Sequence, residues 1–271
     1  KSNPPFYRWF EDGITNTCYN ALDVHIDNGR GDKVALIYDS PITGDKKQFT
    51  YNELRKKVSK FAGALKNHGI AKGDRVIIYM PMIPEAVIAM LACGRIGAIH
   101  SVVFGGFASN ELASRIDDSK AKLLITASCG FEPGRTVEYK PLVDDAIKMA
   151  SHKIDKMILF QREGHDVKLS APNEVSWDEV VSNSKEVDCV EIKSNDFAYI
   201  LYTSGTTGVP KGIVRDTGGH IVALKWTMKN IYNIDIDDVW WSASDIGWIV
   251  GHSYIVYAPL FYGCTTVLFE G

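Results

Sequence analysis

The chain has 271 residues, of which 45% are hydrophobic and 23% are charged, so it is long enough for one large or two modest globular domains. Its net charge of −3 gives no reason to expect a protein that binds nucleic acid or a membrane surface, and no apolar run has the length of a membrane span. Five widely spaced cysteines without zinc-type pairs favour a reducing compartment, the cytoplasm or the mitochondrial matrix, over a disulfide framework.

The N-terminal part of the chain predicts an alternation of helices and strands. Thr50 and Glu53 have the spacing of a helix capping box, and Gly69 is suited to cap the same helix at its C-terminal end. The segment from Glu85 to Ile96 carries almost no charge, so both faces of that helix should be covered. In chain order, the pattern predicts a helix over residues 17–25, strands over 34–38 and 48–51 joined by a hairpin loop, a helix over 50–69, a strand over 75–79, a helix over 85–96 and a strand over 98–103.

The alternation continues to the end of the chain. The pattern predicts a helix over residues 109–118, a strand over 122–126, a loop over 128–135, a helix over 139–151, a strand over 156–160, an irregular stretch over 162–196 with a short helix from Ser176, a strand from Phe197, a helix over 218–232 with Ile221, Leu224, Met228 and Ile231 on its inner stripe, a strand over 239–242, a helix from 251 and a strand over 265–269. This order predicts an α/β fold of mostly parallel sheets with crossover helices.

The most specific functional signal in the sequence is a polar, glycine-containing loop that ends at Lys211. Glycines let backbone N–H groups approach a ligand, and with neighbouring hydroxyls and one lysine they form a plausible phosphate cradle. The loop is not a Walker A motif, because two residues instead of four separate Gly205 from Gly208 and no hydroxyl follows the lysine to bind Mg²⁺. Judged from local sequence alone, a polar hairpin turn is the alternative. The cradle residues are Thr203, Ser204, Gly205, Thr206, Thr207, Gly208 and Lys211.

This loop, Tyr202-Thr-Ser-Gly-Thr-Thr-Gly-Val-Pro-Lys-Gly212, resembles the signature of the adenylate-forming acyl-CoA synthetases. Residues 76–97, 100–107 and 245–257 add a similarity to their short-chain branch, the acetyl- and propionyl-CoA synthetases, which extends over nearly the whole chain. The resemblance implies that residues 1–271 are the N-terminal part of the large adenylation domain. It also implies that the family's C-terminal lid domain is absent from this sequence, so the chain alone is not expected to complete catalysis.

The resemblance implies a two-step reaction on small-molecule substrates. A short-chain carboxylate, propionate or acetate, attacks the α-phosphate of ATP to give acyl-AMP and pyrophosphate, and coenzyme A then displaces AMP. ATP, Mg²⁺ and coenzyme A are the expected cosubstrates. Lys211 is the expected catalytic residue, because its ammonium group can stabilise charge that develops on the pyrophosphate. No residues with metal-ligand spacing are found in the sequence.

The same resemblance suggests the other binding residues. Gly105, Gly106 and Arg135 match segments that contact coenzyme A, although Glu132 stands where a second arginine is common. The segment from Trp248 to His252 matches the acyl-pocket segment. Within it, Val250 is more typical of propionyl-CoA synthetases than threonine would be. The acyl-pocket residues are Trp248, Ile249, Val250 and His252, with Val250 also expected near coenzyme A.

Simpler interpretations stay open for these residues. The apolar ones could be ordinary core, Arg135 a solvated loop charge and His252 a buried histidine with satisfied hydrogen bonds. For the whole chain, the alternatives are a non-catalytic module that binds nucleotide or coenzyme A, and an adenylating ligase for another carboxylate. A dinucleotide oxidoreductase is disfavoured, since no GxGxxG motif follows a strand.

Overall fold

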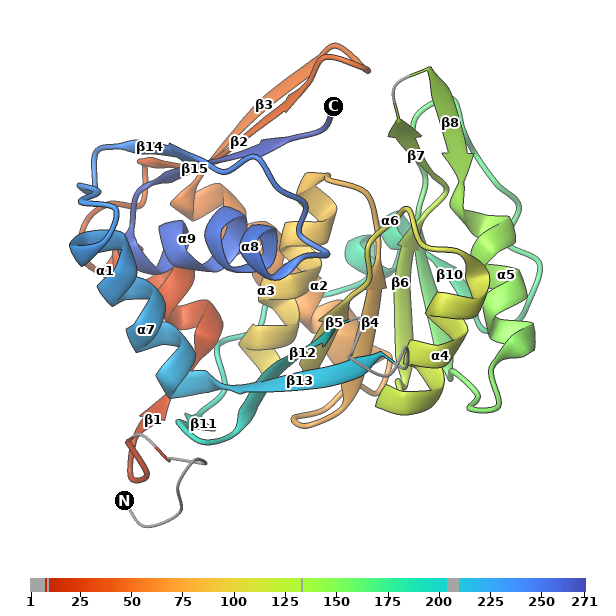
Figure 1. The fold of residues 1–271 in the computed structure, drawn as a ribbon, viewed down its shortest axis with the longest axis horizontal. Helices are drawn as coiled ribbons and strands as arrows, with labels where there is room; N and C mark the ends of the chain where they lie inside the picture. Colours follow the sequence, from red (N-terminus) through yellow and green to blue (C-terminus); the bar gives the residue numbers. More distant parts are fainter. Residues whose placement is uncertain (1–7, 9, 133, 204–209) are drawn as a thin grey trace.

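The computed structural model describes Arg8 and residues 10–132, 134–203 and 210–271. Figure 1 labels most elements of this part of the chain. The elements are, in order, β1 (Ile14–Thr15), η1 (Tyr19–Asp23), α1 (Val24–Asp27), β2 (Val34–Ser40), β3 (Asp45–Thr50), α2 (Tyr51–Asn67), β4 (Arg75–Tyr79), α3 (Pro84–Ile96), β5 (Ile99–Val102), α4 (Ser109–Ser119), β6 (Leu123–Ala127), β7 (Cys129–Glu132), β8 (Arg135–Glu138), α5 (Tyr139–Met149), β9 (Lys156–Phe160), β10 (Glu174–Ser176), α6 (Trp177–Ser182), β11 (Ile192–Lys193), β12 (Phe197–Thr203), β13 (Lys211–Asp216), α7 (Thr217–Asn230), β14 (Val239–Trp241), α8 (Ile249–Gly251), η2 (His252–Tyr257), α9 (Ala258–Tyr262) and β15 (Thr265–Phe269), where η marks a π-helical segment.

The larger sheet has the strand order β10-β9-β6-β4-β5-β12-β13. All neighbours pair in parallel except β13, which pairs antiparallel with β12 at one edge. Helices α4 and α5 cover one face, and α2 and α3 lie on the other (Figure 1). The predicted α/β fold of mostly parallel sheets with crossover helices is therefore confirmed.

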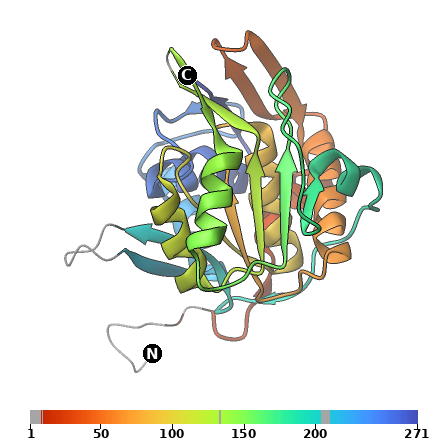
Figure 2. The same ribbon diagram turned by 90° about the vertical axis from the view of Figure 1, so that its right-hand side faces the viewer.

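The central strands are apolar throughout because both faces of the sheet are covered. In β4, Val76 and Ile78 pack into the core beneath α2 and α3, whereas Ile77 and Tyr79 pack into a second core beneath α4 and α5. All four side chains are inaccessible to solvent. Figure 2 shows α4 and α5 standing in front of this sheet.

A second sheet joins strands from the two ends of the sequence. Its order is β14-β15-β2-β3, with β15 parallel to both β14 and β2 and with β3 antiparallel to β2. Thr266 is a register partner of Leu36, so residues more than two hundred positions apart pair directly. The predicted hairpin and the predicted final strand over 265–269 both belong to this sheet.

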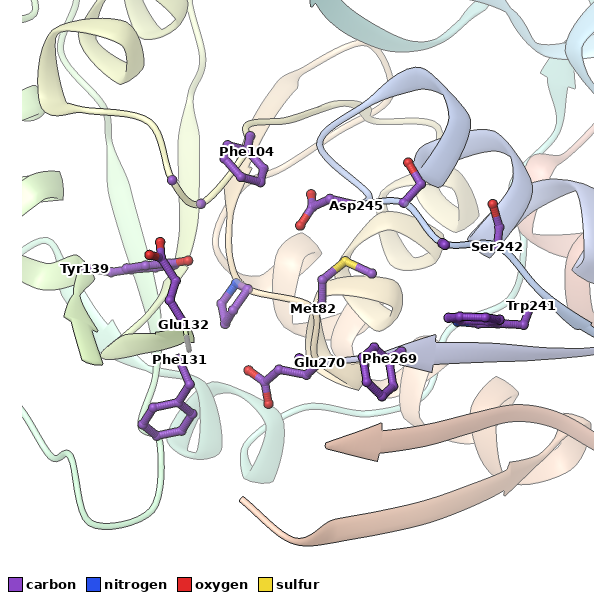
Figure 3. Close-up of a pocket in the computed structure, with 16 residues that line it drawn as sticks. Met82, Phe104, Phe131, Glu132, Tyr139, Trp241, Ser242, Asp245, Phe269 and Glu270 are labelled. Atoms are coloured by element: carbon purple, nitrogen blue, oxygen red, sulfur yellow. The ribbon is translucent and has the colours of Figure 1, made fainter. Parts of the chain in front are cut away.

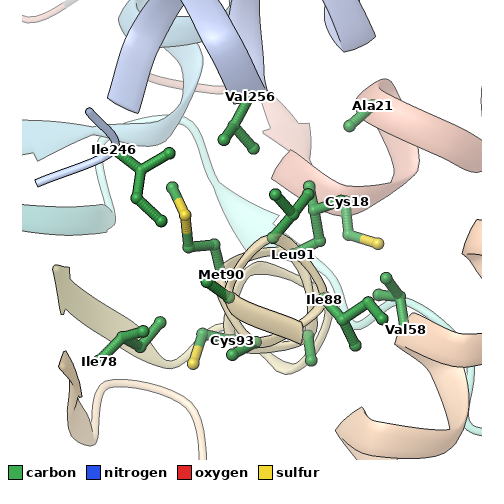
Figure 4. Close-up of a cluster of buried hydrophobic side chains, with 14 of the residues drawn as sticks. Cys18, Ala21, Val58, Ile78, Ile88, Met90, Leu91, Cys93, Ile246 and Val256 are labelled. Carbon is green, nitrogen blue, oxygen red and sulfur yellow. The ribbon is translucent and has the colours of Figure 1, made fainter. Parts of the chain in front are cut away.

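Helix α3 is the central element of the core. All 13 of its residues are buried except Glu85, as the lack of charge in this segment predicted. Figure 4 shows its surroundings: Val58 from α2, Ile78 from β4, Ala21 from η1 and Val256 from η2. Helix α2 has the predicted capping box between Thr50 and Glu53. Among the described residues, no helix is long and apolar enough to cross a membrane.

Three local predictions were wrong. Residues 128–135 are not a loop, because Cys129–Glu132 and Arg135–Glu138 pair as an antiparallel hairpin. Helix α7 ends at Asn230, so Ile231 leaves the inner stripe and is 62% exposed. The stretch from 162 to 196 contains the short strands β10 and β11, which lack a strand-like sequence and are held by their neighbours β9 and β1.

Candidate active site

A cavity of about 460 Å³ opens where strands of both sheets end (Figure 3). Most of its walls are formed at or just after the carboxyl ends of β4, β5, β14 and β15, the edge at which open α/β sheets usually bind ligands, and strand β7 and the start of α5 complete them. The lining residues are Pro81, Met82, Phe104, Gly105, Gly106, Phe131, Glu132, Tyr139, Trp241, Ser242, Ala243, Ser244, Asp245, Phe269, Glu270 and Gly271.

Gly105 and Gly106 form a turn that has no room for side chains. A Cβ atom on Gly105 would lie 2.0 Å from the Tyr139 hydroxyl, and one on Gly106 would lie 2.4 Å from the Phe104 ring. The single hydroxyl proton of Tyr79 is shared between the carbonyls of Gly105 and Phe107, which lie 3.1 and 2.7 Å from its oxygen. The contacts with Tyr79 and Tyr139 therefore fix the turn, and its backbone faces the cavity.

An aromatic group joins this turn to the predicted acyl segment. The rings of Phe104, Phe107 and Trp248 lie 5.5 to 5.8 Å apart, centroid to centroid. Gly247 makes the approach possible, because a Cβ there would lie 2.6 Å from the Cα of Phe104. Trp248, Ile249 and Val250 are about half exposed and lie beside the cavity rather than in its lining.

Three carboxyl groups of described residues line the cavity: Glu132 and Glu270 are each paired with an arginine, whereas burial favours the neutral form of Asp245. Glu132 accepts hydrogen bonds from Arg135, whose Nη2 lies 2.6 Å from its Oε2. Glu270 accepts from both terminal nitrogens of buried Arg162 and from the hydroxyl of Tyr38. Burial raises the pKa of Asp245 to about 6, although the Gly247 N–H opposes this shift.

Arg135, predicted to bind coenzyme A, therefore has a partner before any ligand arrives. Its side chain is 70% exposed at the rim, so solvent screens the pair with Glu132. Glu132 stands where the resemblance would place a second arginine, and a carboxylate alone at that position would repel phosphate. In the structure it lines the cavity and orients the arginine.

His252 lies in the interior, behind the exposed turn of Trp248. Its Nε2 is 3.0 Å from Nε2 of His100, which is in turn 3.1 Å from the hydroxyl of Tyr257. Burial lowers the pKa of His100 and His220 to about 3 and that of His252 well below its usual value, so all three rings are neutral. His252 is thus a core histidine and does not line the cavity.

The predicted phosphate loop is carried by a hairpin. Thr203 ends β12, Lys211 begins β13, and the two are register partners on exposed ends of their strands. Ser204, Gly205, Thr206, Thr207 and Gly208 lie outside the described residues. Because β12 is parallel to β5, Thr203 leaves the sheet at the same edge as Phe104.

Four polar or polarisable residues of the lining were not predicted from the sequence: Met82, Tyr139, Asp245 and Glu270. The available signal was their position, since most of them follow a predicted strand at its carboxyl end. What the sequence did not show is that the two sheets meet at this edge.

The described residues offer one group of three potential metal ligands within 4.8 Å of one another, Cys18, Asp23 and Cys189. Arg95 already donates to both oxygens of Asp23, and the two sulfurs are unsuited to Mg²⁺, which prefers oxygen ligands. This group does not fit the Mg²⁺ that the resemblance implies, and we assign no reaction step to it.

Comparison with known proteins gives consistent matches. Residues 24–271 match the family model described as AMP-binding enzyme. Human acyl-CoA synthetase short-chain family member 3, mitochondrial, is 57% identical over 98% of this chain, and Streptomyces avermitilis acetyl-coenzyme A synthetase is 46% identical over 100% of it. The chain spans 39% and 41% of these relatives. The solved acetoacetyl-CoA synthetase from Streptomyces lividans aligns over 99% of this chain and 40% of its own, with a TM-score of 0.89 and 25% identity.

Proposed function

Because this chain belongs to the AMP-binding enzyme family, we propose that it is the N-terminal part of the large adenylation domain of a short-chain acyl-CoA synthetase. The complete enzyme would join a short carboxylate to coenzyme A through an acyl-adenylate, with release of pyrophosphate and AMP. The observation that carries this proposal is 57% identity, over 98% of the chain, to a relative named as a short-chain acyl-CoA synthetase.

Lys211 and the hydroxyl-rich loop would hold the triphosphate of ATP. The antiparallel pairing of Thr203 with Lys211 supports this role, since it fixes the spacing of the loop's two ends at the carboxyl edge of the sheet. Lys211 is exposed, so its ammonium group can reach a ligand. A preorganised cation at this position would stabilise negative charge on the pyrophosphate leaving group. We propose no protein ligand for Mg²⁺.

The uncharged pantetheine arm of coenzyme A would lie in the cavity. Gly105 and Gly106 offer backbone groups at close range, and the arginine partners of Glu132 and Glu270 reduce the negative field that a neutral chain would meet. Arg135, at the rim, would exchange Glu132 for a phosphate of coenzyme A. The planar guanidinium is suited to that exchange because it binds phosphate and carboxylate in the same geometry.

The acyl group would bind against Trp248, Ile249 and Val250. These exposed apolar side chains suit a short hydrocarbon, and the nearby Phe104 and Phe107 extend the apolar surface. His252 would support the segment from the core instead of contacting the carboxylate. Valine at position 250 favours propionate over acetate, although one methylene discriminates by only about 1–3 kcal/mol.

The decisive experiment is carboxylate-dependent ATP–pyrophosphate exchange by the full-length enzyme with acetate, propionate or butyrate. We expect exchange with propionate and acetate, and a loss of about 10²–10³ in rate for Lys211→Ala, the effect of removing one donor to developing charge. Lys229→Ala, on the exposed side of α7, is the matched control and should retain wild-type exchange. Exchange that does not depend on any carboxylate would refute the proposal.

Two other functions make different predictions. An adenylating ligase for another carboxylate would show exchange with a different acid and no acyl-CoA product. A non-catalytic module would bind ATP or coenzyme A without exchange. The name of the human relative includes "mitochondrial", which supports the mitochondrial matrix as the compartment, and all five cysteines are free thiols.

A further inference from the structure

Arg115 of helix α4 lies between two aromatic rings that belong to different segments of the site. Its guanidinium carbon is 4.8 Å from the ring centroid of Phe107 and 5.3 Å from that of Tyr202. The residue is 4% exposed. Phe107 ends the glycine turn beside the cavity, and Tyr202 immediately precedes Thr203, so one side chain contacts both segments.

The guanidinium is held in place by its own helix. Its Nη1 donates to the backbone carbonyl and the carboxylate of Glu111, at 2.7 Å in each case. Glu111, one helical turn away, thus pairs with this buried cation, while the guanidinium carbon of Arg115 lies over both rings. The arginine is therefore a fixed spacer between the rings.

Tyr202 makes a second contact with the same helix. Its hydroxyl donates to the carboxylate of Asp118, at 2.7 Å. Arg115 and Asp118 are three positions apart, so they lie on the same side of α4 and hold the ring of Tyr202 at its face and its tip. Strand β12 is thereby anchored to α4 at the residue before the phosphate loop.

The other ring is fixed just as firmly. Phe107 packs edge-on against Phe104 and Trp248, and the Tyr79 hydroxyl holds its carbonyl. A shift of α4 would therefore displace the end of β12 relative to the glycine turn. Tyr202 and Phe107 are both partly exposed, so their contacts with Arg115 do not belong to the buried core alone.

We propose that Arg115 is a positioning residue that sets the spacing between the phosphate loop and the coenzyme A turn, with Asp118 as its partner on Tyr202. The inference rests on the proposed function for the roles of the two segments. It goes beyond that function in predicting that a residue in contact with neither substrate governs the affinity for both. Binding of ATP and binding of coenzyme A should therefore weaken together when Arg115 is changed.

The test uses the full-length enzyme and the variant Arg115→Met, which keeps an apolar side chain of similar length. We expect the dissociation constants of ATP and of coenzyme A, measured separately by calorimetry, each to rise about fivefold to tenfold. A rise of this size corresponds to the loss of about one desolvated cation–π contact. The KM for the carboxylate should change less than twofold. Tyr202→Phe, which keeps the ring but loses the bond to Asp118, should weaken ATP binding and leave coenzyme A binding unchanged.

Arg75→Met is the matched control, because Arg75 also anchors α4, through the carbonyls of Ser119 and Lys120, but stacks on neither ring. It should lower thermal stability without changing either dissociation constant. If Arg115→Met lowers stability but leaves both dissociation constants within twofold of wild type, or if Arg75→Met reproduces its effect on them, the proposal is overturned. Direct binding separates this result from failure of the proposed function, which would appear in the wild type as absence of exchange.

Discussion

The guanidinium of Arg162 binds both carboxylate oxygens of Glu270, at 2.7 and 3.0 Å, in a nearly solvent-free contact between the two sheets. Arg162 follows β9 of the larger sheet, and Glu270 follows β15 of the smaller one. Tyr38 of β2 donates a further hydrogen bond to the same carboxylate. The pair therefore fixes one wall of the cavity to the other sheet.

Removing one member of this pair should destabilise the fold strongly. We expect Arg162→Met to lower the free energy of unfolding by about 3–5 kcal/mol, because Glu270 is left charged and buried without its partner. The double variant Arg162→Met/Glu270→Leu should lose less than this single variant. Urea denaturation measures both values. Lys148→Met is the control, since its pair with Asp145 is mostly exposed and should contribute less than about 1 kcal/mol; a similar loss in both single variants would contradict the prediction.

The glycine turn should not tolerate a methyl group. In Gly105→Ala the new Cβ would lie 2.0 Å from the hydroxyl of buried Tyr139, so the turn or the tyrosine must move. We expect a loss of about 1–3 kcal/mol in stability, as for other overpacked sites. We also expect a larger rise in KM for coenzyme A than for ATP.

The tyrosine hydroxyl provides a control for this prediction. Adding Tyr139→Phe to Gly105→Ala removes the closest contact and should restore part of the lost stability. Thermal denaturation and steady-state kinetics measure the two effects. A double variant no more stable than Gly105→Ala would show that the contact with the hydroxyl is not the cause.

Protonated Asp245 should add to the free energy of unfolding, and this contribution should decrease as pH rises. Burial raises the pKa of Asp245 to about 6, whereas the unfolded value is about 4, so the folded state binds the proton more tightly. The contribution is complete below about pH 4 and is lost as pH rises through about 6. Relative to Asp245→Asn, the wild type should lose up to about 3 kcal/mol between pH 4 and pH 7. Urea denaturation at four pH values checks this, and a difference between the two proteins that is independent of pH would refute it.

His220 should act in the opposite direction. Both of its ring nitrogens are buried without a hydrogen-bond partner among the described residues, and burial lowers its pKa to about 3. The unfolded chain takes up a proton below about pH 6.5 but the folded state does not, so stability falls by about 1.4 kcal/mol per pH unit as pH decreases from 6.5.

His220→Phe should remove this pH dependence. The ring contacts with Tyr199 and Phe261, at 4.9 and 5.6 Å between centroids, suit a phenyl group. Between pH 8 and pH 5 the wild type should lose about 2 kcal/mol more than the variant does. Denaturation of both proteins at the two pH values provides the measurement. Equal losses in the two proteins would refute the prediction, because they would show that titration of His220 does not contribute to the pH dependence.

Hydrophobic periodicity and helix caps predicted the scaffold well. The strand over 75–79 and the strand over 265–269 have the predicted bounds, because each is a short apolar run between polar turns. The start of α2 follows from the pairing of Thr50 with Glu53, which is local in sequence. Elements whose stability is local, or whose two faces are both buried, are thus readable from the sequence.

The cavity was less predictable because its contacts are not local. The sequence predicts a loop at Glu132 and Arg135, because the short segments that pair as β7 and β8 carry no strand-like pattern. Glu270 and Arg162 are 108 positions apart and meet only when the two sheets are assembled. Neither contact leaves a periodic pattern in the sequence.

The hairpin that carries the phosphate loop has an electrostatic consequence. In P-loop proteins the strand leads into a helix, and the macrodipole of that helix places partial positive charge beside the phosphates. Here β13, a strand with little net dipole, follows the loop directly. If the loop binds phosphate as proposed, a side chain would have to supply the compensating charge, and Lys211 should then be harder to replace than a lysine assisted by a helix terminus.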